Sequence, residues 1–117
     1  MEKTSKRQQL DRDNPASDER VSVDRRYGPV SEVFAALASP LRAAIVHRLT
    51  VRDHTVAELV DLLGAAQPLV SQHLSRLKNA GLVDGERHGR QVVYRIADEH
   101  VAHIFLDALQ HSAEHED

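Results

Sequence analysis

Residues 55–98 decide the fold, and they read TVAELVDLLGAAQPLVSQHLSRLKNAGLVDGERHGRQVVYRIAD. Apolar residues recur at helical spacing over 56–63 and again over 67–80, with a short Gly-containing turn between the two segments. After Gly81 the period changes to two, and a polar stretch divides two apolar ones. This pattern predicts a hairpin over 82–96 that turns near His88 and Gly89. Two helices, a tight turn and a hairpin predict a winged helix-turn-helix, which is a mainly α fold with a small β-hairpin.

Further helices are expected on both sides of this stretch. Ser39-Pro40 ends one helix and starts another that runs to about Arg52, because proline is favoured in the first turn of a helix. Thr55 and Asp98 have the side chains of helix caps, and Asp98 precedes a last helix that extends to about Ser112. Residues 1–28 are half charged and lack apolar periodicity, so we expect a flexible charged arm there and one domain over 29–117.

Composition excludes several classes of protein. The chain has 117 residues, 41% of them apolar, which is the size of one domain. It has no cysteine, so disulfides, thiolate metal ligands and cysteine nucleophiles are excluded. No apolar run approaches the roughly 18 residues of a membrane span, and no secretory signal opens the chain. We therefore expect a soluble, cytoplasmic protein with no membrane partner.

The formal net charge is −3, but the charges are distributed unevenly. Residues 67–95 hold five Lys or Arg and two acids, whereas residues 96–117 hold six acids and no Lys or Arg. On a wheel of helix 67–80, Val70, Leu74 and Leu77 form one buried stripe. The rest of the surface is polar and free of acids, and it carries Ser71, Gln72, Ser75, Arg76 and Asn79.

That polar face has the chemistry of a DNA-reading helix. Gln, Asn and Arg make bidentate contacts to base edges, and Ser contacts bases or phosphates. Arg87 and Arg90 at the hairpin tip would lie beside the DNA backbone or the minor groove. We therefore predict a double-stranded DNA partner. The alternative is an ordinary helical hairpin with a solvated face, and spacing alone does not exclude it.

The last helix has a stripe of potential metal ligands. His100, His103, Asp107, His111 and Glu114 share its polar side, opposite a wide apolar arc. His111 and Glu114 lie one turn apart, and Asp98 meets His100 at the helix start. These two pairs cannot share one ion within a chain, since His100 and His111 are separated by about 16 Å of helical rise.

A second copy of the helix, running antiparallel, would solve that geometry. Asp98 and His100 of one chain would then meet His111 and Glu114 of the other, which gives two symmetric sites per homodimer. Two imidazoles and two carboxylates suit tetrahedral Zn(II), with Co(II) or Ni(II) as alternatives. Two alternatives are not excluded. One is a metal site within one chain, formed by His103 with Asp107 or by His111 with His115. The other is a solvated helix face that binds no metal. The other histidines, His47, His54, His73 and His88, are scattered and suggest no site.

Four segments together resemble the ArsR/SmtB family of metal-sensing winged-helix repressors: LASPLRAAIVHRL, QPLVSQHLSRLKNAGLV, GERHGRQVVYRIAD and DEHVAHIFLDALQHSAEH. They cover about residues 30–115 in order. The last segment is similar to the C-terminal-helix zinc site of the family's zinc sensors, and its matching residues are Asp98, His100, His111 and Glu114. Gln67, Ser71, Gln72 and Ser75 fall on the family's DNA-contacting positions.

The resemblance implies a homodimeric repressor that binds an inverted-repeat operator without metal and releases it when zinc binds. One departure is that DHTVAELVDL has no thiol where some members carry a cysteine-containing metal site, so arsenite and lead sensing are not expected. Another is Gln72-His73, where many members have His-Gln. A regulator that senses no metal is the main competing hypothesis. A small zinc hydrolase is the other, but the chain shows no nucleophile constellation or phosphate loop, so we expect neither an enzyme nor a small organic substrate.

Overall fold

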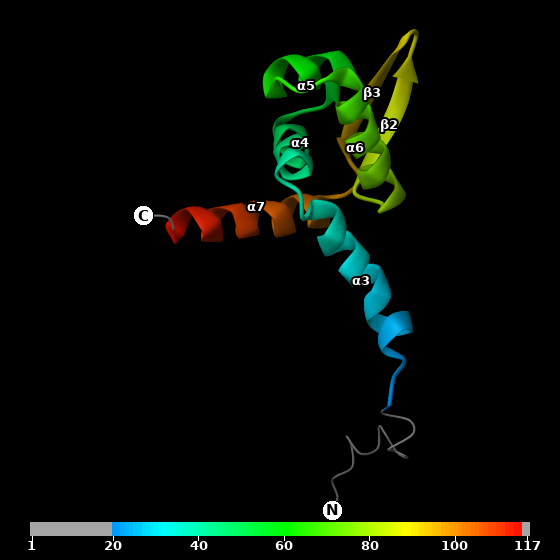
Figure 1. The fold of residues 1–117 in the computed structure, drawn as a ribbon, viewed down its shortest axis with the longest axis vertical. Coiled ribbons are helices and arrows are strands. Elements are labelled where there is room, and N and C mark those ends of the chain that lie inside the picture. The colour runs from blue at the N-terminus through cyan, green and yellow to red at the C-terminus, as the bar shows by residue number, and fades with distance from the viewer. Residues whose placement is uncertain (1–19, 116–117) are drawn as a thin grey trace, which may run out of the picture. The chain divides into compact units, whose positions relative to one another are not determined.

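The computed structural model describes residues 20–115 (Figure 1). Its elements are α3 (Val23–Leu37), α4 (Pro40–Val51), β1 (His54–Thr55), α5 (Val56–Leu63), α6 (Gln67–Asn79), β2 (Val83–His88), β3 (Gln91–Ile96) and α7 (Glu99–Glu114). The chain divides after Glu32 into two units, each of which is described by itself. From Val33 onward the order of elements is that of a winged helix-turn-helix, so the predicted fold class is confirmed.

Polar caps set the helix boundaries, as the sequence predicted. The Ser39 hydroxyl accepts a hydrogen bond from the backbone N–H of Arg42 (3.3 Å) at the start of α4. At the start of α5 the Thr55 hydroxyl accepts from the Glu58 N–H, and the Glu58 carboxylate accepts from the Thr55 N–H (3.0 Å). The Thr55 N–H and the nearby Arg52 hold the pKa of the Glu58 carboxyl below its usual value. This reciprocal pair fixes where the helix-turn-helix begins.

The core lies beneath α6. Val70, Leu74 and Leu77 are fully buried, and they pack with Ile45 of α4 and Leu59 of α5. Three apolar residues on one side of a helix bury one face and thereby expose the opposite face. The predicted stripe is therefore confirmed, and it fixes which side chains of α6 meet solvent.

The hairpin belongs to a three-stranded antiparallel sheet with the order β1-β3-β2. Strands β2 and β3 pair from Val83 opposite Ile96 to His88 opposite Gln91, and Gly89 turns the chain with a φ of 67°. The short strand β1 was not predicted, because two residues are too few to show an alternating pattern. It pairs His54 with Tyr94 and so joins the start of α5 to the wing.

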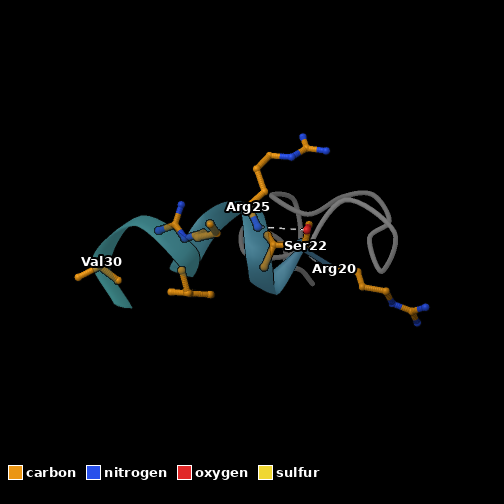
Figure 2. A pocket seen from close by; sticks show the side chains of 7 residues that line it. Arg20, Ser22, Arg25 and Val30 are labelled. Carbon is orange, nitrogen blue, oxygen red and sulfur yellow. Dashed lines mark hydrogen bonds between the residues drawn. The ribbon is translucent and has the colours of Figure 1, made fainter. Parts of the chain in front are cut away.

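Two boundaries differ from the sequence prediction. Helix α3 begins at Val23, inside the segment assigned to the arm, and it contains Pro29. Its first turn is capped by the Ser22 hydroxyl, which accepts from the Arg25 N–H (3.3 Å, Figure 2), and Asp24 suits the positive end of the helix. Helix α7 continues two residues beyond Ser112, to Glu114. The remainder of the arm, residues 1–19, lies outside the described part of the chain.

No single helix in the described residues is long and apolar enough to cross a membrane, and α3 and α4 pass that test only as a bent pair.

Gly64 supplies a stability test of the helix-turn-helix. It ends α5 in the left-handed conformation, with a φ of 64°, and its N–H bonds the Val60 carbonyl. Gly64→Ala should lower the free energy of unfolding by about 1 kcal/mol, because a Cβ is strained at positive φ. Gly64→Asn should lose less, since asparagine tolerates this region. Urea denaturation measures both, and equal stability of Gly64→Ala and wild type would contradict the assignment.

Candidate nucleic-acid interface and metal centre

The exposed side of α6 and the wing form a groove. Gln67 and Ser71 come from α6 and Arg90 from the hairpin turn, and all three line one groove. Its other lining residues are Thr55, Val56, Ala57, Gln91, Val92 and Tyr94. The sequence did not single out Gln91 or Tyr94, since the pairing with β1 that brings them here had no signal of its own.

Ser71 also borders a second hollow along α6. Gln72 and Ser75 line it with Ala66, Pro68 and Leu69. Five of the seven predicted DNA-binding residues therefore surround two adjoining hollows that share Ser71. The other two lie elsewhere: Arg76 is half-buried on α6, and Arg87 is exposed on β2, where its guanidinium donates to the Gly89 carbonyl (3.4 Å).

The arginines of the wing differ in whether their charge is paired with a carboxylate. The Arg95 guanidinium donates to the Glu86 carboxylate at 3.0 Å, and His88 lies 3.7 Å from the other oxygen of the same carboxylate. The bond from Arg95 lowers the pKa of the Glu86 carboxyl, and His88 lowers it further. Arg95 is thus neutralised in an ion pair, so the positive charge that the wing presents to solvent comes from the exposed Arg87 and Arg90.

At the start of α7 the structure brings Asp98 and His100 together. The Asp98 carboxylate lies 3.7 Å from Nδ1 of His100, and both side chains are exposed. The same carboxylate accepts from the Val101 N–H (3.1 Å) and caps the helix. One carboxylate oxygen therefore serves the cap, and the imidazole beside it is open to a ligand.

At the far end of α7 the second predicted pair is arranged differently. The His111 ring lies beside the His115 ring, with centroids 4.3 Å apart, and the His111 carbonyl is 2.9 Å from Nδ1 of His115. Glu114 accepts from the Gln110 amide (3.2 Å). His111 and Glu114 are both exposed, so each can turn toward an ion without unpacking the core.

Within the part of one chain that the structure describes, no three His, Asp or Glu side chains are grouped so that they could hold a metal. Each of the two predicted pairs, Asp98 with His100 and His111 with Glu114, offers one carboxylate and one imidazole, which is half of a tetrahedral zinc set. The donor chemistry therefore fits Zn(II), provided that a second copy of the chain supplies the other half.

A further hollow lies in the N-terminal unit (Figure 2). Arg20, Ser22, Arg25 and Arg26 line it together with Val21, Tyr27 and Val30, all from one continuous stretch. The Arg26 guanidinium lies 5.6 Å from the centre of the Tyr27 ring. Sequence reasoning selected none of these arginines, because acids interrupt them along the chain.

The order of the elements and the exposed polar side of α6 define a winged helix-turn-helix protein. Residues 39–84 match the profile described as "Bacterial regulatory protein, arsR family". The chain is 58% identical over 83 residues, 71% of its length, to the HTH-type transcriptional repressor SmtB of Mycobacterium tuberculosis, and this match spans 62% of that relative. The HTH-type transcriptional regulator NmtR of the same organism is 41% identical over 71% of the chain and 69% of the relative.

A solved structure agrees with these sequence matches. It is the homodimeric winged helix-turn-helix DNA-binding domain Mb0332 of Mycobacterium bovis, a possible ArsR-family regulator. Its TM-score is 0.77 at 30% identity, over 84% of this chain and 91% of that one. The chain belongs to the ArsR family of bacterial regulatory proteins.

Because Asp98 caps α7, its substitution tests structure as well as metal binding. Asp98→Ala removes the acceptor of the Val101 N–H and should cost about 1 kcal/mol of folding free energy. Asp98→Asn keeps an acceptor in the same place and should stay close to wild type. Thermal denaturation without metal compares them, and equal losses in both variants would show that the carboxylate charge, and not the cap, stabilises α7.

Proposed function

We propose that this protein is a homodimeric transcriptional repressor that binds an operator through α6 and the wing and releases it on binding Zn(II). The observation that carries the DNA-binding part is the gathering of Gln67, Ser71, Gln72, Ser75 and Arg90 around two adjoining hollows. Helix α6 would enter the major groove with Gln72 and Ser75 facing base edges. Arg76, Arg87 and Arg90 would contact phosphates or, for Arg90, the minor groove.

The dimer is supported by apolar side chains that one chain leaves uncovered. Ile104, Leu106 and Leu109 of α7 are exposed by 38–45%, and every residue of α7 from Leu106 onward is exposed. Burying such a stripe against a second copy is favourable, at about 25 cal/mol per Å² of apolar surface. A two-fold dimer also presents two α6 helices to two half-sites.

Zinc would bind between the two copies of α7. Asp98 and His100 of one chain would meet His111 and Glu114 of the other, with the Asp98 oxygen that does not serve the cap and the exposed imidazoles as donors. The ion supplies a fixed tetrahedral centre that joins the two helices. It would thereby fix the angle between the chains and move the α6 helices away from the roughly 34 Å spacing that DNA requires.

A regulator without a metal effector is the second candidate. The arrangement that favours it is at the end of α7, where the His111 ring lies tilted beside the His115 ring and Glu114 accepts from Gln110 within the same helix. Zinc calorimetry on wild type and His111→Ala separates the two functions, since only a zinc sensor loses tight binding in the variant.

Arg90 tests the DNA interface. Arg90→Ala should weaken binding to all DNA sequences and flatten the slope of log K against log salt by up to about one unit per lost phosphate contact. Arg90→Lys is the matched control, because it keeps the charge and should keep most of the slope. Fluorescence anisotropy with a promoter fragment at several salt concentrations measures both quantities. If Arg90→Ala keeps the wild-type affinity and slope, the wing does not touch DNA.

A mixed dimer tests the shared zinc site. Homodimers of Asp98→Asn or of His111→Ala should lose high-affinity zinc, because each lacks one ligand at both sites. A dimer with one chain of each kind has one site without both ligands and one intact site. Calorimetry on the purified mixed dimer should therefore find one tight zinc per dimer, against two in wild type. Finding none in the mixed dimer would falsify the shared site and favour ligands from a single chain.

A further inference from the structure

Arg42 connects three elements of the domain. From the first turn of α4 its Nε donates to the Ala36 carbonyl at 2.6 Å, and one terminal nitrogen lies 3.5 Å from the Ala35 carbonyl. Its other terminal nitrogen lies 3.1 Å from Nδ1 of His73, in the middle of α6. One guanidinium thus holds both the C-terminal end of α3 and the helix that carries Gln72 and Ser75.

We propose that Arg42 is a positioning residue for DNA binding, which fixes the orientation of α6 through His73. This inference rests on the proposed DNA-binding function. No role for His73 could be predicted from the sequence, because its partner lies 31 positions away along the chain.

The chemistry of the contact is specific to these two residues. Arginine has only donors, so Nδ1 of His73 must accept, and the proton of the neutral ring lies on Nε2. The last carbonyls of α3 lack the usual donors four residues further on, the Ala35 carbonyl also accepts from the Ala38 N–H (3.1 Å), and a cation suits that end of the helix dipole. A planar guanidinium reaches all three acceptors at once, whereas a lysine ammonium on its flexible stem cannot match that geometry.

The position of His73 explains why the contact would affect DNA and not stability alone. His73 directly follows Gln72, so the bond restrains the turn of α6 that faces the second hollow. The buried stripe fixes which side of α6 faces the core, and a small rotation about the helix axis would still change where its exposed side chains point. A polar contact on the flank of the helix opposes such a rotation, and base readout depends on the aim of the side chains.

The test is a double-substitution cycle read on operator affinity. Arg42→Met and His73→Leu should each weaken binding to a promoter fragment about tenfold, which is the scale of one lost hydrogen bond to a charged group. Their combination should weaken it no further, since both remove the same contact. His73→Gln offers the guanidinium a side-chain oxygen and should restore most of the affinity, whereas Arg42→Lys should not. Arg52→Met is the control, because Arg52 lies beyond the other end of α4 and bonds the Asp53 carbonyl.

Salt dependence separates positioning from direct contact. In Arg42→Met the slope of log K against log salt should equal that of wild type, because no phosphate contact is lost. A slope flattened by about one unit per subunit would show that Arg42 binds phosphate and would overturn the proposal. Losses that multiply to about a hundredfold in the double variant, or unchanged affinity with a lowered Tm, would overturn it as well. If Arg42→Met does not fold, the contrast between His73→Leu and His73→Gln decides alone. Wild type that binds no promoter fragment would refute the proposed function itself.

Discussion

The burial of Val70, Leu74 and Leu77 is the constraint on which the rest of this structure depends. These three side chains have no exposed surface, and they hold α6 against Ile45 and Leu59. When one stripe of a helix packs on the core, the residues on the opposite side of that helix face solvent. Which side chains of α6 face a partner, from Gln67 to Ser75, follows from that packing, and the wing beside α6 completes the groove that they line.

A second constraint is the length of α7. The two ligand pairs stand at opposite ends of a helix of 16 residues, too far apart to share an ion in one chain. If zinc binds as proposed, metal binding and dimer formation are one event, because each metal site needs both copies. Linkage then requires that DNA weaken zinc binding by the same factor as zinc weakens DNA binding.

Local signals in the sequence were enough to predict most of the fold. Ser39, Thr55 and Asp98 mark helix starts and Gly64 marks an end, because capping is chemistry within a few residues. The start of α3 was placed too late, since the charged residues up to position 28 show no apolar periodicity, whereas the helix begins at Val23. Strand β1 and the bond from Arg42 to His73 could not be predicted, because both join residues far apart in sequence and have no periodic pattern.

Part of the candidate site could also be predicted from the sequence, and part could not. The residues of α6 follow from one helical wheel, and Arg90 follows from the turn of the hairpin. These residues line one groove because of how the strands of the sheet pair, and the pairing of β1 with β3 could not be predicted from the sequence. The candidate metal ligands are ordered along one helix and were predicted in pairs, whereas the neighbours that contact His111 and Glu114 are known only from the structure.

Zinc and operator DNA are expected to exclude one another on this dimer. The decisive measurement is zinc titration of the preformed protein–promoter complex, followed by fluorescence anisotropy of the labelled DNA, with a chelator added at the end. We expect the anisotropy to fall to the value of free DNA as the two sites of each dimer fill, and the chelator to restore it. Zinc that binds at two per dimer while the DNA stays bound would contradict this mutual exclusion.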